Sequence, residues 1–235
     1  MVQNSKIQFR IQNSKSEKLL GVTIDNKLSF TEHVRKICDK ASQKLNALAR
    51  LSSFMSLEKR RLIMKAFVNS QFGYCPLIWM FHNRTLNNRI NRIHERALRI
   101  VYQDKKSSFN ELLRRDNTVT VHQRNLQVLA TELYKVKMGL APQLVKEIFP
   151  LSTQAYNLRS TYEFKLENVK TVHYGTESLS FLGPKIWELV PLEIKSSQSL
   201  EDFKQKIKSW IPENCPCRLC KTYIPGLVYA NVVGI

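Results

Sequence analysis

The hydrophobic period of the chain changes near residue 28. Before it, residues 6–11 (KIQFRI) alternate polar and apolar side chains, and residues 18–25 (KLLGVTID) form an apolar run rich in β-forming residues. After it, apolar side chains recur every three or four positions up to residue 51, which is the period of an amphipathic helix. These patterns predict a short β-ribbon within residues 1–28, followed by a long helix.

Helical periodicity continues to residue 149. Residues 57–80 predict an unusually apolar helix, which we expect to be the most buried element. It should bend or break before Pro76, because proline disfavours helix at the residue before it. Three further helices are expected, over residues 84–102, 107–115 and 120–139. Together these segments predict a helical bundle over residues 29–149.

The pattern of polar and apolar residues changes again beyond residue 150. Residues 150–212 mix short β-prone runs with two short helices, the second of which should begin after a Ser199 cap. Residues 213–235 form a cysteine-containing tail. The predicted fold class is therefore mainly α: a helical bundle preceded by a β-ribbon and followed by a smaller mixed α/β C-terminal region.

The charge balance adds a first indication of a partner. The 235 residues contain 37 Lys and Arg against 19 Asp and Glu, which gives a formal charge of +18. Such an excess repels itself unless an anion neutralises it, so nucleic acid is the first hypothesis, and a membrane surface or an acidic protein is the alternative. The N-terminus lacks an apolar leader and the longest nearly apolar run, residues 74–81, is too short to cross a bilayer. We expect a soluble, intracellular protein without a membrane partner.

Residues 84–102 concentrate the positive charge on one helical face. Four arginines lie at i, i+3, i+7 and i+10, an apolar stripe follows one position later, and Glu95 is the single acidic residue in the segment. Because guanidinium groups match phosphate oxygens, we expect this face to contact nucleic acid without reading bases. The alternative is a solvated charged face. The candidate contact residues are Arg84, Arg89, Arg92, Arg96, Arg99, Lys105 and Lys106.

Cysteines carry the sharpest chemical signal. Cys215, Cys217 and Cys220 place three thiols within six residues, which could bind Zn²⁺ if a fourth ligand is supplied. No Cys or His follows Cys220, so the fourth ligand would come from elsewhere in the chain or from a second chain. The candidates within the chain are His173, Cys38 and Cys75. The alternative is a reduced, exposed cysteine loop.

Motifs for catalysis are missing from the sequence. The aspartates are solitary, whereas two-metal phosphoryl transfer needs paired carboxylates, and no P-loop, G-x-S-x-G or H-E-x-x-H motif occurs. We interpret the histidines in helical or capping positions as surface or hydrogen-bonded groups: His33, His82, His94 and His122. An aromatic group, Phe72, Tyr74, Trp79 and Phe81, fits a buried core better than a base-stacking platform. No independent enzymatic activity is expected.

Three long strings carry a family resemblance: residues 19–34 (LLGVTIDNKLSFTEHV), residues 40–102 and residues 215–224 (CPCRLCKTYI). With these strings the chain resembles the C-terminal portion of reverse transcriptases from non-LTR (LINE-type, jockey-like) retrotransposons of animals. The resemblance implies that LGVTID is the closing strand of a polymerase palm and that the following helices are the thumb, which grips template and primer.

The resemblance also implies what the chain should lack. In such polymerases the catalytic carboxylates, which hold Mg²⁺, lie upstream in a Tyr/Phe-x-Asp-Asp turn, and an endonuclease lies further upstream still. We therefore expect a truncated copy that binds RNA, DNA or their hybrid in cytoplasm and nucleus but does not catalyse polymerisation. The cysteine tail is similar to tails of such elements for which a zinc-knuckle role is inferred.

Two other functions fit the sequence. The chain could be a protein-interaction module that docks on missing polymerase segments, or on another copy of itself, through an apolar surface around Phe9, Leu19 and Val22. It could also be a fragment of an element without function of its own.

Overall fold

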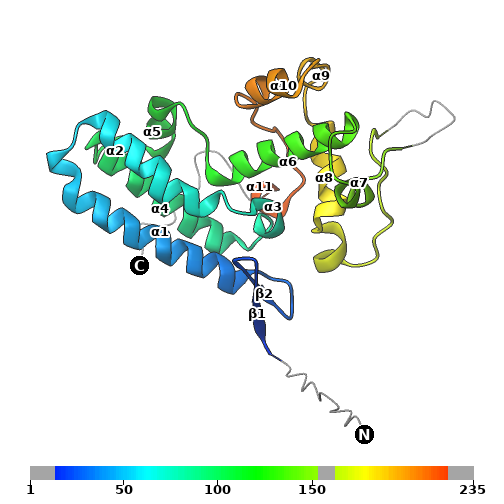
Figure 1. Cartoon of the computed structure of the whole chain (residues 1–235), viewed down its shortest axis with the longest axis horizontal. Coiled ribbons are helices and arrows are strands. Elements are labelled where there is room, and N and C mark those ends of the chain that lie inside the picture. Colours follow the sequence, from blue (N-terminus) through cyan, green and yellow to red (C-terminus); the bar gives the residue numbers. More distant parts are fainter. Residues whose placement is uncertain (1–13, 153–161, 222–235) are drawn as a thin grey trace, which may run out of the picture.

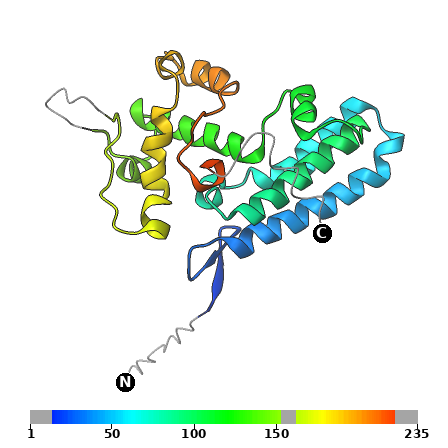
Figure 2. The same cartoon turned by 180° about the vertical axis from the view of Figure 1, so that it is seen from behind.

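The computed structural model describes residues 14–152 and 162–221. This part of the chain is mainly helical, with one small antiparallel sheet near its start (Figure 1). The expected helical class and the expected leading ribbon are both confirmed. Seen from either side, the elements form two groups that α6 connects, one group around α1 and α4 and the other around α8 and α10 (Figures 1 and 2).

The ribbon forms within the apolar run 18–25 and its immediate flank. Strand β1 (Ser16–Leu19) pairs with β2 (Val22–Asp25), with Ser16 opposite Asp25. Leu20 and Gly21 both have positive φ, 45° and 87°, as a tight two-residue hairpin requires. The sequence predicted residues 18–25 as one apolar, β-prone part of the ribbon, but the Leu20–Gly21 turn divides this segment between β1 and β2. The other predicted strand, residues 6–11, lies outside the described residues.

Tyr74 supports this turn from the bundle. Its hydroxyl donates a hydrogen bond to the Leu20 carbonyl at 2.5 Å, and its ring lies so close to Gly21 that a Cβ there would come within 3.3 Å of Tyr74 Cε1. On the ribbon itself Val22 is buried, at 3% exposure, while Leu19 remains exposed. The expected docking surface around Phe9, Leu19 and Val22 is therefore wrong at Val22, and Phe9 lies outside the described residues.

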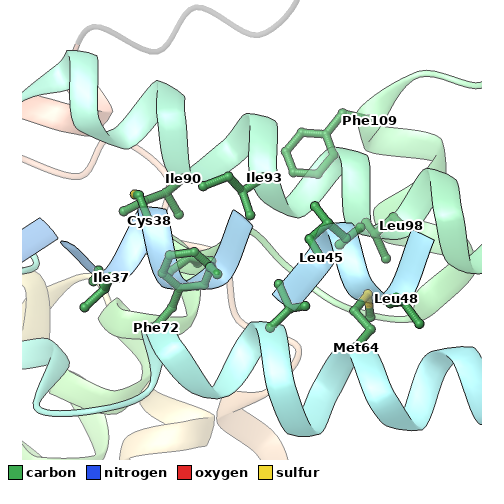
Figure 3. Packing of buried hydrophobic residues seen from close by; sticks show 14 of the residues in the cluster. Ile37, Cys38, Leu45, Leu48, Met64, Phe72, Ile90, Ile93, Leu98 and Phe109 are labelled. Carbon is green, nitrogen blue, oxygen red and sulfur yellow. The ribbon is translucent and has the colours of Figure 1, made fainter. Parts of the chain in front are cut away.

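The first core packs around two long amphipathic helices. Helices α1 (Thr31–Leu51) and α4 (Arg84–Tyr102) lie against each other, and Figure 3 shows Ile37, Cys38 and Leu45 of α1 facing Ile90, Ile93 and Leu98 of α4. The other elements of this core are η1 (Ser52–Phe54), α2 (Leu57–Ile63), η2 (Met64–Val68), η3 (Asn69–Phe72) and α5 (Phe109–Asp116). Hydrophobic burial between these faces is the main force that holds this half of the molecule together.

Residues 57–80 depart from the single buried helix that we expected. Helix α2 ends at Ile63, and the chain continues as the π-helix η2 and the 3-10 helix η3. Helix α3 (Pro76–Trp79) starts only after Cys75, which has a left-handed φ of 43°. The break before Pro76 is confirmed, but the expectation of the most buried element is wrong. Only one side of the segment faces the first core, so Leu62 and Phe67 on the other side are 68% and 53% exposed.

The second core contains most of α6 (Val121–Lys137) and the C-terminal helices. Tyr134 of α6 stacks on Phe203 with ring centroids 4.2 Å apart, and its hydroxyl donates to the Ser197 carbonyl at 2.6 Å. The other elements on this side are α7 (Gln143–Ile148), η4 (Val172–Thr176), α8 (Leu179–Glu188), α9 (Leu192–Lys195), α10 (Leu200–Ile207) and α11 (Arg218–Lys221). Ser199 caps α10 as expected, by accepting a hydrogen bond from the Asp202 amide. Leu151 and Phe164 form a single β-bridge.

Arg60 ties the first core together through the backbone. The side chain is buried and its guanidinium donates to three carbonyls: Val101 at 2.8 Å, Met55 at 2.8 Å and Ser52 at 3.1 Å. The Val101 carbonyl belongs to the last turn of α4, where the helix dipole favours a cation. One side chain therefore fastens the end of α4 to the turn that joins α1 and α2.

We expect Arg60→Met to lower the free energy of unfolding by about 2–4 kcal/mol, because the carbonyls would remain buried without their donor. Urea unfolding followed by circular dichroism measures this change. Lys59→Met, at the exposed neighbouring position, is the matched control and should change stability by no more than about 0.5 kcal/mol. Equal stability of the two variants would contradict the role given to Arg60.

Candidate nucleic-acid interface and metal cluster

Helix α4 presents the predicted arginine stripe to solvent. The helix starts after Asn83, whose side chain accepts a hydrogen bond from the Leu86 amide at 2.9 Å, and it ends where Gln103 turns left-handed. One face is buried in the first core through residues that include Ile90, Ile93 and Ala97. On the opposite face Arg92 and Arg96 are exposed, and neither has an ion-pair or hydrogen-bond partner for its side chain among the described residues.

Both ends of the stripe are paired with carboxylates. Arg89 forms an ion pair with Asp39 of α1, and Arg99 pairs with Glu95 one turn earlier in α4 at 2.7 Å. The sequence indicated only Glu95, because Asp39 is 50 residues away from Arg89 along the chain. Four arginines and two acidic partners leave this face with a net charge of +2, which Arg92 and Arg96 carry at its centre.

Further cations lie at the two ends of α4. Arg84 is the exposed first residue of the helix, where no acidic residue in the first turn balances the dipole. Lys105 and Lys106 are exposed in the turn after the helix. The neighbouring acidic residue, Asp104, already has partners: it accepts hydrogen bonds from Ser107 and forms an ion pair with Arg115. These contacts, above all the hydrogen bonds from Ser107, hold the pKa of Asp104 well below its usual value. No described carboxylate pairs with Arg84, Lys105 or Lys106.

Four histidines that we interpreted as surface or hydrogen-bonded groups are all buried: His33, His82, His94 and His122. The surface interpretation is therefore wrong, while hydrogen bonding is confirmed for His33, which accepts from the Thr23 amide at 3.3 Å, and for His82, whose Nδ1 lies 2.9 Å from the Trp79 carbonyl oxygen. Burial lowers the pKa of His82 to about 4 and that of His94 to about 3. Both rings are neutral at pH 7.

The four residues of the aromatic group differ in their burial. Phe72 and Trp79 are buried in the first core, as expected, and Phe81 is half-buried against the second core. Tyr74 is 52% exposed, but its ring and hydroxyl are occupied by the hairpin turn. The described structure therefore presents these rings as packing residues.

The cysteine loop is buried against the start of α6. Cys217 is fully buried, Cys215 is 4% exposed, and the Cys217 sulfur lies 3.3 Å from Nε2 of His122. The donor atoms of His122, Cys217 and Cys220 all lie within 4.8 Å of one another. Cys215, the third predicted thiol, lies buried in the same loop but is not part of this group. This is a possible metal-binding cluster, and the alternative of an exposed loop is wrong.

His122 is the candidate ligand that sequence reasoning missed. It lies 95 residues before Cys217, and at the second position of a capped helix it gives no local signal of metal binding. Cys38 and Cys75, two of the fourth ligands that we considered, do not join the cluster, and Cys38 is packed in the first core. The side chain of His173 lies outside the described part of the structure. Among the described residues, His122, Cys217 and Cys220 form the one group of three or more His, Cys, Asp or Glu donors placed to hold a metal ion.

No family model matches the chain, and no curated protein or solved structure shows significant similarity to it. The resemblance to non-LTR reverse transcriptases therefore remains a prediction from the sequence. In the described residues, every helix is too short or too polar to cross a membrane.

The buried histidines generate a prediction about pH. A histidine whose pKa falls from 6.5 to about 3 or 4 on folding stabilises the fold fully above pH 6.5, and this contribution is lost as the pH falls below 6.5. When the pH is lowered from 7 to 5, we expect His82 and His94 each to lower the free energy of unfolding by about 2 kcal/mol. His94→Leu should remove roughly half of that loss. Urea unfolding at both pH values measures it, and an undiminished loss in the variant would contradict the assignment.

Proposed function

We propose that the chain binds nucleic acid through the outer face of α4, as the thumb-like, template-primer-binding part of a non-LTR retrotransposon RNA-directed DNA polymerase. The observation that carries the proposal is the pair Arg92 and Arg96, exposed one turn apart and unpaired within the described structure, on a helix whose other face is buried. The sequence resemblance supplies the polymerase context. The proposal assigns no catalytic step to this chain, and Mg²⁺ belongs to the intact parent enzyme.

The spacing of the cations supports a phosphate backbone as the ligand. Arg92 and Arg96 are four residues apart, which is about 6 Å along a helix axis, and consecutive phosphates of one duplex strand advance by about 3.4 Å along its axis. From Arg89 to Arg99 the stripe spans about 15 Å, or roughly four such steps. Arginines at this spacing therefore lie close enough together to contact several phosphates of one strand.

The acidic partners limit the strength of this contact. Asp39 and Glu95 hold Arg89 and Arg99 in place and neutralise half of the charge of the stripe. No side chain identified on this face is arranged to read base edges, so we propose a sequence-tolerant contact with RNA, DNA or their hybrid. Such a contact holds a duplex while allowing it to move along the protein, as a polymerase thumb requires. The compartments that this function implies are the cytoplasm and the nucleus.

Charge reversal tests the proposal. We expect Arg92→Glu combined with Arg96→Glu to weaken binding of a fluorescently labelled RNA–DNA hybrid about tenfold or more, because two charge-assisted contacts become repulsive. Fluorescence anisotropy titration at about 50 mM salt measures the change. Circular dichroism of the variant should match the wild type, because neither side chain is buried.

A matched control separates the α4 face from diffuse positive charge. Lys204 and Lys208 are also exposed and four residues apart, but they lie on and just after α10, beside the second core. Lys204→Glu combined with Lys208→Glu changes the net charge equally and should weaken binding less than about threefold. If both double variants lose the same affinity, or if neither does, the α4 interface is wrong.

A second candidate function is protein docking, and exposed apolar side chains favour it. Phe54, Leu62 and Phe67 are 86%, 68% and 53% exposed on η1, α2 and η2, and Leu19 and Leu20 are exposed on the ribbon. Missing polymerase segments or another copy of the chain are the partners that would cover such a surface. Self-association that rises with protein concentration and resists salt would favour this function over nucleic-acid binding.

We also propose that the cysteine cluster binds Zn²⁺. Thiolate and imidazole donors select zinc, whereas Mg²⁺ and Ca²⁺ prefer oxygen ligands. The cluster offers such donors within reach of one another, with His122 and Cys217 buried and Cys220 half-buried.

A further inference from the structure

Two local structures aim the donors of the cluster at one point. The Cys220 amide donates to the Cys217 carbonyl at 3.2 Å, which closes a tight turn and brings both thiols to one side of the loop. On the other side, Thr120 and Gln123 form a reciprocal capping box that fixes the first turn of α6 and the position of His122 within it. His122 is 6% exposed, and Nε2 is the ring atom that faces the thiols.

The distances fit a tetrahedral zinc ion. With Zn–S bonds of about 2.3 Å and Zn–N bonds of about 2.0–2.1 Å, tetrahedral geometry separates a sulfur from a nitrogen by about 3.6 Å and two sulfurs by about 3.8 Å. The His122–Cys217 separation of 3.3 Å and the 4.8 Å limit for the group of three are close to these values. A bound ion would require a slight widening of the His122–Cys217 distance and a contraction of the longer distances within the group.

Cys215 supplies the remaining donor. Its free thiol is 4% exposed in the same loop and borders the same pocket as His122 and Cys220. It lies outside the group of three donors within 4.8 Å of one another, so it would move toward them when the ion binds. A pocket lined by His122, Cys215 and Cys220, together with Asn87 and Asn91 of α4, gives a metal ion a path from solvent. Three thiols and one imidazole make the closed set of four that a structural zinc site requires.

We propose that His122 is the fourth ligand of a Cys₃His zinc site with Cys215, Cys217 and Cys220, and that this site clasps the C-terminal loop to the helical bundle. The inference rests on the proposed zinc binding and adds to it the missing ligand and the structural role. A zinc knuckle draws its ligands from one short segment and folds by itself. Here one ligand precedes the others by more than 90 residues, so the metal closes a long loop instead.

The position of the clasp explains what it would hold. His122 lies at the start of α6, beside Val121, which packs in the first core, while the later turns of α6 pack in the second core. Helix α11, which carries Cys220, contacts α4. Zinc would therefore fix the end of the described chain against the helix that carries the arginine stripe, at the junction of the two cores.

Metal analysis of the full chain tests the site. We expect the protein purified under reducing conditions to contain one zinc per chain and, after replacement by Co²⁺, to show the visible absorption of a tetrahedral cobalt–thiolate site. His122→Ala should weaken zinc binding at least tenfold in a competition titration with a chromogenic chelator. His122→Cys should restore tight binding through a fourth thiolate, and Cys75→Ser, outside the cluster, should keep one zinc per chain.

The role as a clasp has its own readout. A strong chelator should lower the midpoint temperature of unfolding of the wild type and of His122→Cys, because the metal binds only the folded arrangement of distant ligands. If the wild type binds no zinc, both the zinc proposal and the clasp fail. If it binds zinc but His122→Ala binds equally tightly, zinc remains and His122 is not a ligand. If zinc is bound through His122 but its removal leaves the unfolding temperature unchanged, the clasp is wrong.

Discussion

The cost of removing guanidinium groups from water fixes how α4 sits in the molecule. Each apolar side chain on its inner face gains about 25 cal/mol for every Å² that it buries, whereas an unpaired buried charge costs several kcal/mol. The helix can satisfy both terms in only one rotation about its axis. In that rotation Ile90, Ile93 and Leu98 pack against α1 (Figure 3), and Arg92 and Arg96 face solvent. Because α1, α2, α5, α6 and α11 all contact α4, the arrangement of the first core follows from that rotation.

The cost of burying an unpaired charge also explains why Arg60 and Asp116 have hydrogen-bond partners. Arg60 has no carboxylate partner in the described structure, but three carbonyl oxygens satisfy its donors. Asp116, which is 1% exposed, accepts from Arg61 at 2.6 Å and from the Tyr102 hydroxyl at 2.9 Å. These two buried charges have partners, whereas the exposed Arg92 and Arg96 have none in the described structure, which fits a surface available to an external anion.

Local patterns in the sequence predicted the parts of the fold that are governed by local interactions. The helices α1, α4 and α6 follow from apolar residues at helical spacing, and the Ser199 cap marks the start of α10. The hairpin was misjudged because Leu20, a residue that seldom adopts positive φ, occupies a turn position. The segment after Ile63 was misjudged because periodicity does not reveal which side of an apolar helix lacks a neighbour. The Arg89–Asp39 pair and the approach of His122 to Cys217 join residues 50 and 95 positions apart, and only the folded chain brings them together.

The dependence of nucleic-acid binding on salt tests the central claim most directly. Arg84, Arg92, Arg96, Lys105 and Lys106 are the five cations at α4 without an acidic partner in the described structure, and each phosphate that they neutralise should contribute about 0.9 to the slope of log affinity against log salt concentration. Titration of a labelled RNA–DNA hybrid across a salt series should therefore give a slope of about −4.5 if each of the five cations neutralises one phosphate. A slope near zero, from a chain shown to be folded, would mean that the arginine face of α4 is only a solvated surface.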